Sequence, residues 1–211
     1  GGAVLPTNCA SGSDCWGTGL YDKDYTDDNN GAAFKEVLLS PTLDLSSGTA
    51  VKDPSVYFDS FHQLMTLSTS SSTNPTYRYA DCAYIEIRTS PTPVFDPAAT
   101  WEHIDIDIQN SSGLSFGSGY YQVGSSGSNN KIDGRCNGVN YNDYALGGTS
   151  ISTFNPSGWA SIKLDLSDYG GNYIELRFVL EYNNVLPSGG YNVYNVTSMP
   201  GWYIDNFRFG S

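Results

Sequence analysis

Basic residues are scarce in this sequence. Ten Lys and Arg stand against 22 Asp and Glu, and the formal net charge is −12. Because a protein that binds phosphates needs a basic surface, this balance excludes nucleic acid as a partner. The acidic excess is compatible with divalent cations and neutral glycans, and equally with a role in solubility alone.

Long hydrophobic runs are absent as well. No apolar stretch approaches the ~20 residues that a membrane-spanning helix needs, and no signal peptide is recognisable, so we expect no direct membrane insertion. The chain begins with Gly1-Gly2, which is typical of a cut or linker end. We therefore expect a mature protein or a module excised from a larger one.

Cysteine and histidine are few. The two histidines and four cysteines form no C-x-x-C pair or Cys/His cluster, which argues against zinc. The even number of cysteines predicts two disulfides, a local Cys9–Cys15 and a long-range Cys82–Cys136, with four free thiols as the alternative. Disulfides indicate an oxidising compartment, and hence an extracellular, cell-surface or periplasmic location.

Catalytic motifs are also lacking. There is no H-E-x-x-H, no Gly-rich phosphate loop and no Cys/His dyad. Residues 113–117 match G-x-S-x-G, but both histidines precede Ser115, and that motif requires a histidine downstream. Paired carboxylates for glycoside cleavage are not singled out among the 22 acids. We expect a non-catalytic protein, with a stand-alone glycan-cleaving enzyme as the alternative.

The pattern that is present is that of β-strands. No segment keeps a helical period over ten or more residues, whereas apolar and polar residues alternate in several stretches. In the stretch from 173 to 182, for example, Ile174, Leu176, Phe178 and Leu180 form one apolar face. We predict a single all-β domain over residues 1–211, a sandwich of roughly ten strands, with residues 110–150 as a loop-rich insertion. The other alternating stretches are 82–89, 101–108 and 159–166.

Seven short stretches are familiar when taken together in chain order. They are 14–18, 39–45, 56–59, 83–87 with Thr100-Trp101, 158–167, 172–178 and 201–207. In this order they resemble the MAM-like jelly-roll modules of bacterial secreted and surface proteins, which also accompany the catalytic domain of immune-inhibitor-A-type metallopeptidases. The resemblance covers most of the chain apart from 110–150, and it implies a two-sheet jelly roll whose first and last strands are adjacent.

The resemblance further implies a structural calcium ion near Asp205, which interrupts the aromatic run of residues 201–209. A carboxylate inside a strand is costly unless it is paired, hydrogen-bonded or bound to a metal. Calcium takes six to eight oxygen ligands, and residues 21–31 form an acidic, amide-rich loop that offers an excess of them. The alternative is a solvated loop, with Asp205 bonded to an arginine or to backbone amides. The expected ligands are Asp205, Asp22, Asp24, Asp28 and Asn30.

A second group of metal-binding residue types lies on one strand. His103, Asp105 and Asp107 share a face of the predicted strand 101–108. The solvent face of a half-buried strand has the same pattern, and we favour that interpretation over a transition-metal site.

Tyrosines in the longest loops are the candidates for ligand binding. Their flat faces can stack on sugar rings, and neighbouring Asn, Asp and Ser can bond hydroxyls, although each tyrosine could equally cover a sandwich edge. We expect an adhesin-like recognition module that binds glycan or another cell-surface ligand as part of a larger secreted or surface protein, of which a fibre tip is one form. The alternative is an accessory domain of a secreted hydrolase with no ligand. The tyrosines are Tyr120, Tyr121, Tyr141, Tyr144, Tyr191 and Tyr194.

Overall fold

The computed structural model describes residues 9–17, 34–46, 53–64, 66–69, 77–79, 82–104, 120–124, 131–133, 144–146, 158–182, 191–194 and 201–210. These residues contain fifteen strands and one short 3-10 turn, and none of their helical segments could cross a membrane. The elements are β1 (Trp16–Gly17), β2 (Phe34–Leu39), β3 (Leu43–Asp44), β4 (Ser55–Gln63), β5 (Thr66–Thr69), β6 (Tyr77–Tyr79), β7 (Cys82–Ser90), β8 (Glu102–Ile104), β9 (Tyr120–Gly124), β10 (Lys131–Asp133), β11 (Tyr144–Leu146), β12 (Ala160–Asp165), η1 (Ser167–Tyr169), β13 (Tyr173–Tyr182), β14 (Tyr191–Tyr194) and β15 (Gly201–Gly210).

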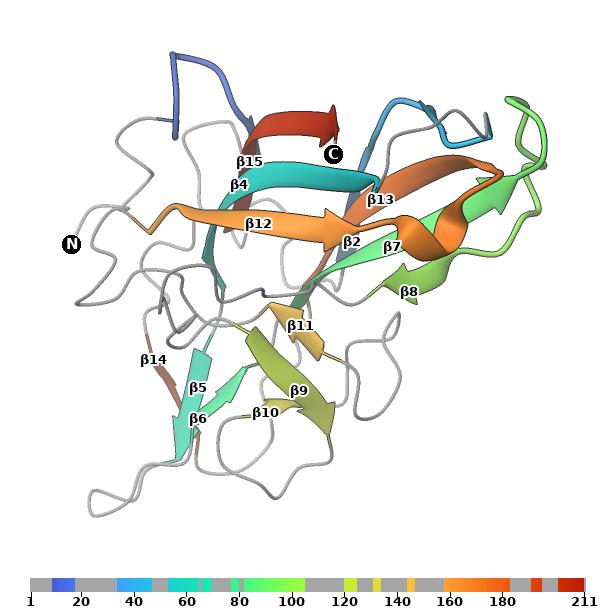
Figure 1. Ribbon diagram of the computed structural model, residues 1–211. Helices are drawn as coiled ribbons and strands as arrows, with labels where there is room; N and C mark the ends of the chain where they lie inside the picture. Colours follow the sequence, from blue (N-terminus) through green and yellow to red (C-terminus); the bar gives the residue numbers. More distant parts are fainter. Residues whose placement is uncertain are drawn as a thin grey trace.

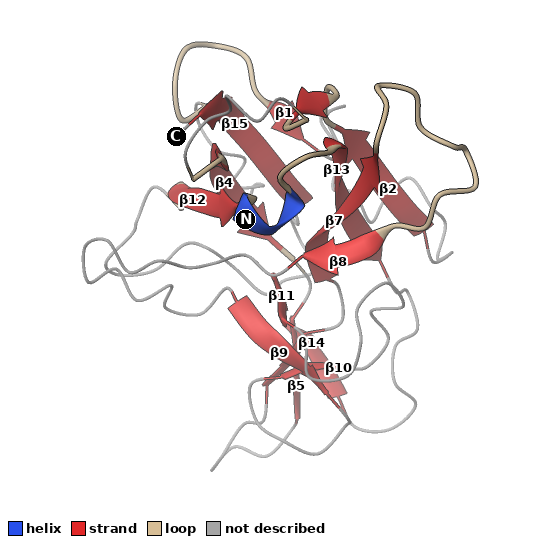
Figure 2. Cartoon of the chain, turned by 45° about the vertical axis from the view of Figure 1, so that its right-hand side comes forward, coloured by secondary structure: helices blue, strands red, loops and turns tan. Residues whose placement is uncertain are grey.

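Two antiparallel sheets pack face to face in the upper part of the molecule (Figures 1 and 2). The first has four strands in the order β1-β15-β4-β12. The sandwich part of the second has the order β8-β7-β13-β2, and β3 follows β2 along the same edge of β13. The predicted all-β sandwich is therefore confirmed.

The connectivity is that of a jelly roll. When β2 and β3 are counted as one interrupted strand, the sandwich has eight strands in chain order. The first sheet contains the first, eighth, third and sixth of them, and the second sheet contains the second, seventh, fourth and fifth. The first and last strands are neighbours, as expected, since Trp16 of β1 lies opposite Ile204 of β15.

The inner faces of the two sheets form the core. The four apolar residues predicted to share a face of β13 are all buried, none being more than 2% exposed. Phe178 lies at their centre and packs edge-on against Phe58 and Trp202 of the opposite sheet. The Trp202 indole Nε1 donates a hydrogen bond of 2.9 Å to the buried Ser60 hydroxyl, so its only polar atom is satisfied.

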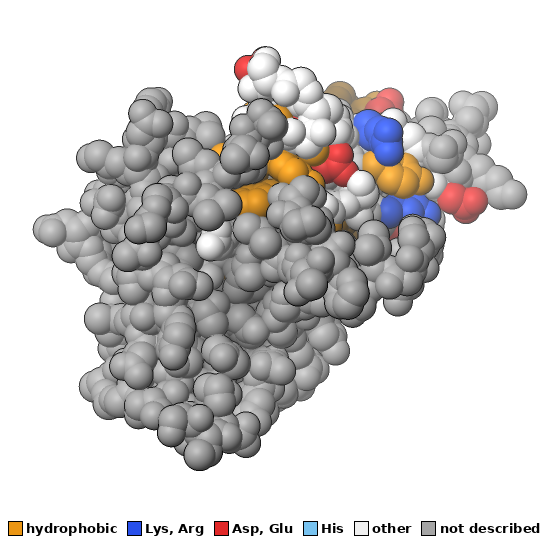
Figure 3. Space-filling view, turned by 90° about the vertical axis from the view of Figure 1, so that its left-hand side faces the viewer, with side chains coloured by type: hydrophobic (Ala, Val, Ile, Leu, Met, Phe, Trp, Pro, Cys, Tyr) orange, Lys and Arg blue, Asp and Glu red, His pale blue; other side chains and the backbone are white. Residues whose placement is uncertain are grey.

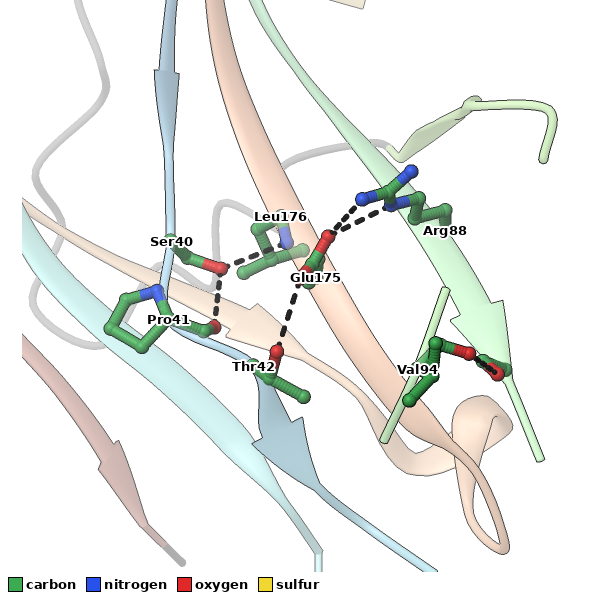
Figure 4. A network of polar contacts seen from close by, with 8 residues as sticks. Ser40, Pro41, Thr42, Arg88, Val94, Glu175 and Leu176 are labelled. Carbon is green, nitrogen blue, oxygen red and sulfur yellow. Dashed lines mark hydrogen bonds and ion pairs between the residues drawn. The ribbon is translucent and has the colours of Figure 1, made fainter. Parts of the chain in front are cut away.

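A serine bridges the break between β2 and β3. The Ser40 amide donates to the Leu176 carbonyl at 2.9 Å. The Leu176 amide donates in turn to the Ser40 hydroxyl, also at 2.9 Å (Figure 4). Pro41 follows and has no amide hydrogen to donate to the ladder. The break at Pro41 thus divides this edge of the sheet into two strands, β2 and β3, which one side chain holds in line.

The long connections leave the sandwich at one end. Gln63 at the end of β4 lies opposite Gly201 at the start of β15, and Phe34 at the start of β2 lies opposite Tyr182 at the end of β13. The connections attached at these points contain most of the residues outside the sandwich. They are residues 18–33, 64–81, 105–159 and 183–200.

Six short strands from three of these connections continue the second sheet beyond the sandwich; we call them the extension. Their order is β11-β9-β10-β6-β5-β14, and β11 joins the sandwich where Leu146 lies opposite Ala83 of β7. Strand β10 runs parallel to both neighbours, β6 and β9. The extension occupies the lower part of Figure 1. Within residues 110–150, where we expected mainly loops, the structure has three strands: β9, β10 and β11.

Candidate functional site

The extension contains five of the six tyrosines predicted to bind ligand. Tyr120 and Tyr121 begin β9, and Tyr144 begins the adjacent β11, where it lies opposite Gln122. Three connections that are distant in the sequence thus contribute to one sheet at one end of the jelly roll. Tyr141 lies outside the described residues.

The remaining two tyrosines lie at the far edge of the extension. Tyr191 and Tyr194 begin and end β14, opposite Thr69 and Thr66 of β5. Three strands, β5, β6 and β10, separate β14 from β9. At about 4.8 Å between neighbouring strands, the two tyrosine groups are roughly 19 Å apart. The predicted set is therefore divided into two groups.

Two further tyrosines, which the sequence pattern did not indicate, lie between these groups. Tyr77 and Tyr79 flank Arg78 in β6, which pairs with β5 on one side and with β10 on the other. The sequence feature that could have indicated them is the motif Tyr-Arg-Tyr, which follows a run of polar residues.

Asp205 lies on the first sheet, opposite Asp59 of β4. One of its oxygens accepts the Ser11 amide at 2.7 Å, and the other accepts the Asn206 amide at 2.6 Å. Asn206 has a left-handed backbone, with φ of 52°, at an irregularity in the pairing of β15 with β4. Asp205 thus accepts hydrogen bonds from two backbone amides, which was the alternative to calcium binding that we expected.

The same network holds the Asp59 carboxylate. Its two oxygens accept hydrogen bonds from the Ser161 hydroxyl and, at 2.6 Å, from the Asn206 side-chain amide. The Ser11 hydroxyl donates in turn to the Asn206 side-chain oxygen at 2.6 Å. Ser11 lies between Cys9 and Cys15, which form the predicted local disulfide. The disulfide-closed segment is thus anchored to β15 by polar contacts.

The oxygen atoms around Asp59 and Asp205 are of the type that binds a hard cation such as calcium. Two carboxylates lie opposite each other, and none of the ion pairs found among the described residues includes Asp59 or Asp205. One Asp205 oxygen accepts two hydrogen bonds, from the amide and the hydroxyl of Ser11, whereas each of the other three carboxylate oxygens accepts one and keeps a second acceptor position. Within the described ranges, no three His, Cys, Asp or Glu side chains converge. The other expected ligands, Asp22, Asp24, Asp28 and Asn30, lie outside the described residues.

A second disulfide involves Cys82. This residue begins β7, is buried, and is disulfide-bonded. Its predicted partner, Cys136, lies outside the described residues.

The outer face of the second sheet has a charged network that the sequence analysis did not predict. Glu86 and Arg88 of β7 lie opposite Arg177 and Glu175 of β13, and each Glu–Arg pair forms an ion pair. The Arg88 Nε donates to Glu175 at 2.8 Å, and the Thr42 hydroxyl donates to the other Glu175 oxygen (Figure 4).

Aromatic rings cover this network. The centroid of the Trp101 ring lies 4.7 Å from the Arg88 guanidinium carbon and 4.5 Å from that of Arg177. Phe95 lies over Arg88 as well, at 4.8 Å. Glu86 is only 5% exposed. These contacts are typical of a stabilising cover over the sheet, and they include no nucleophile poised beside a base.

Next to this network, Tyr84 lies buried on β7. Its hydroxyl donates to Glu181 at 2.6 Å and accepts from the Lys35 ammonium at 3.0 Å. Burial, followed by the hydrogen bond to the Glu181 carboxylate, raises the pKa of Tyr84 well above its ordinary value. Burial likewise raises the pKa of Tyr203 and of Tyr169.

These raised pKa values predict a loss of stability at alkaline pH. Above about pH 10 the tyrosines of the unfolded chain ionise, whereas the buried ones stay protonated, so the unfolded state binds fewer protons and is favoured as the pH rises. We expect the urea midpoint to be level between pH 7 and 9 and to fall above pH 10. Urea unfolding of Tyr84→Phe should show a shallower fall; an equal fall would show that Tyr84 is not involved.

No protein-family model matches this chain, and no curated protein is similar to it in sequence.

Proposed function

We propose that this chain is a non-catalytic recognition module of a secreted or surface protein, of the MAM-like type, with adhesion as its role. It binds glycan or another cell-surface ligand through the extension. The observation that supports this is the gathering of three long, tyrosine-bearing connections at one end of a rigid sandwich. Loops on such a scaffold are where recognition residues usually lie.

The two tyrosine groups are roughly 19 Å apart, and this separation limits the size of the ligand that could contact both. A single sugar could not contact both groups, so we propose an extended glycan that runs across β9, β10, β6, β5 and β14. The same separation favours the second candidate, an accessory domain of a secreted hydrolase with no ligand of its own, because such a domain would scatter its tyrosines.

The disulfides and the net charge support the proposed location and partners of this protein. Disulfides at Cys9 and Cys82 support an extracellular, cell-surface or periplasmic location of a bacterial protein. The net charge of −12 disfavours nucleic acid. We include a structural calcium ion at Asp205, with Asp59 as a ligand that the sequence did not indicate. Oxygen atoms of both side chains and of nearby residues would hold it, and the ion would neutralise the two facing carboxylates.

A glycan array on the purified chain, with calcium and then with EDTA, tests this proposal. Tyr120→Ala and Tyr194→Ala come from the two groups, and each should weaken binding of an extended glycan by about 0.5–1.5 kcal/mol, the scale of one aromatic contact. Tyr173→Ala, in the sandwich strand β13, is the matched control and should leave binding unchanged.

Three other outcomes are informative. Binding lost on Tyr120→Ala but unaffected by Tyr194→Ala would restrict the site to β9 and β11. A loss in EDTA would support calcium as the ion that holds the site. Absence of binding to every glycan in both conditions would favour the accessory-domain candidate.

A further inference from the structure

The outer face of the first sheet has two basic residues on either side of a tyrosine. Tyr57 of β4 lies opposite Lys163 of β12 and opposite Arg208 of β15. The next residues along β4 and β12, Phe58 and Leu164, are buried in the core between the sheets. Because side chains alternate along a strand, Lys163, Tyr57 and Arg208 form one row on the outer face, which we call the basic row.

Neither cation of the basic row is neutralised by an ion pair. The ion pairs found among the described residues lie on the second sheet, and neither Lys163 nor Arg208 takes part in one. The Arg208 guanidinium is exposed and lies over the Tyr57 ring, 5.4 Å from its centroid. Figure 3 looks onto this sheet and shows two basic side chains on either side of one of the hydrophobic class, which includes tyrosine. The basic row therefore offers two cations to an anion from outside the chain.

Acidic residues on both sides limit the charge of that anion. Asp59 and Asp205 lie opposite each other on one side of the basic row, and Asp165 ends β12 on the other side. Asp165 accepts hydrogen bonds from the hydroxyl and the amide of Ser167, which lower its pKa and keep it ionised. A densely charged polyanion would be repelled by these carboxylates, whereas a ligand that places a single carboxylate at the basic row would not.

The row that contains Asp59 is suited to hydroxyl groups. Asp59 lies two residues from Tyr57, about 7 Å along β4. Each Asp59 oxygen accepts one hydrogen bond, from Ser161 or from Asn206, and keeps a second acceptor position. Ser161 is exposed, and its hydroxyl oxygen can accept as well. A ligand with a carboxylate on one side of a pyranose ring and hydroxyl groups on the other fits both rows.

We propose that the outer face of the first sheet binds a carboxylated sugar, namely a uronic acid residue of a glycan. Lys163 and Arg208 bind its carboxylate, and Asp59 accepts hydrogen bonds from its hydroxyl groups. The extension continues the second sheet, so this site does not involve the tyrosines proposed to bind glycan there. It goes beyond that proposal, because it adds a second site and gives the class of sugar.

A matched pair of small glycosides tests this proposal on the intact chain. Methyl β-glucuronide and methyl β-glucoside differ only at C6, which is a carboxylate in the first and a hydroxymethyl group in the second. Each is titrated in EDTA, so that no calcium takes part, and binding is followed by NMR at the side chains of Lys163 and Arg208 and at the Ser161 amide. Glutamate is the third probe, since it has carboxylates but no hydroxyl groups.

We expect the glucuronide to bind more tightly than either the glucoside or glutamate, and added salt to weaken its binding. Lys163→Gln and Arg208→Gln should each raise its Kd by about two- to fivefold, the value of one exposed ion pair. Both changes together should leave it no tighter than the glucoside. Lys35→Gln removes one positive charge from the second sheet and should have no effect. Tyr120→Ala should have none either, whether or not the extension binds glycan.

Four results would overturn the proposal. Equal binding of the glucuronide and the glucoside would show that the carboxylate is not recognised. Equal binding of glutamate would show a site for any carboxylate, including that of an acidic peptide. Binding that occurs only when calcium is restored would assign the carboxylate to that ion rather than to Lys163 and Arg208. Absence of any change in their NMR signals during the glucuronide titration would show that the basic row binds no such sugar.

Discussion

Replacing Arg177 by methionine is expected to destabilise the fold by about 3 kcal/mol. Methionine keeps most of the volume beneath Trp101 but leaves Glu86, which is 5% exposed, without its cation. Removing one partner of a buried ion pair typically costs 3–5 kcal/mol, and the partial exposure of Arg177 places our estimate at the lower end. For a domain of this size, the melting temperature should fall by about 6–12 °C.

The double variant Arg177→Met with Glu86→Met shows whether the loss of stability comes from the unpaired Glu86 carboxylate. A buried ion pair replaced as a whole by apolar residues of similar volume is often neutral or stabilising. We therefore expect the double variant to recover most of the loss. Arg208→Met, which removes an exposed arginine stacked on Tyr57, should cost less than about 1 kcal/mol. If the double variant were as unstable as Arg177→Met, the loss would come from packing under Trp101 rather than from an unpaired carboxylate.

Removing the disulfide at Cys82 should have a larger effect still. If Cys82 is joined to Cys136, as the sequence predicts, the double change to alanine frees a long segment in the unfolded chain. The loop-entropy relation gives a loss of about 4 kcal/mol. Chemical denaturation of the variant and of the parent chain measures this value directly.

The local disulfide provides the matched comparison. Cys9 and Cys15 are only six positions apart, so the same relation gives a smaller loss, of about 2 kcal/mol, for their replacement by alanine. Peptide mapping without reduction should show one fragment that contains both Cys82 and Cys136. A free thiol at Cys136 would contradict the pairing, and equal losses in the two variants would contradict the loop-length argument.

The sandwich was predictable because its strands alternate. In β13, every second residue from Ile174 to Leu180 is apolar, and each of these four is buried against the opposite sheet. A period of two is a local property, so neighbouring residues alone reveal it. The pairing of β1 with β15 was expected only from the resemblance, because nothing in either strand specifies a partner at the other end of the chain.

The cover over the outer face of the second sheet could not be predicted for a related reason. Alternation in β7 places Tyr84 and Glu86 on the face opposite Ala83 and Ile85, but it does not show that this second face is buried too. Tyr84 and Glu86 are buried because the segment after β7 returns over the sheet and places Trp101 on the arginines. Such a cover depends on contacts made by irregular residues, which have no period to detect.

The extension was the least predictable part. Its strands have three to five residues, too few for alternation to be recognised, and two of its pairings, β14 with β5 and β10 with β6, join different connections. The tyrosines could be identified as candidates from composition, but their division into two groups depends on strand order. Asp59 was likewise overlooked as a neighbour of Asp205, since 146 positions separate them and only the register of β4 with β15 brings them together.

The order β1-β15-β4-β12 has a consequence for how the molecule is made. The position between β1 and β4 is taken by β15, so the first sheet cannot close until residues 201–210 have been synthesised. Until then, β1 and β4 lack a common neighbour. Sheets that depend on such distant pairings form slowly, over milliseconds to seconds, and their unpaired edges favour aggregation in the meantime. A nascent chain therefore exposes the unpaired edges of β1 and β4 until residues 201–210 are available, and we expect a chaperone that covers such edges to raise the yield of folded protein.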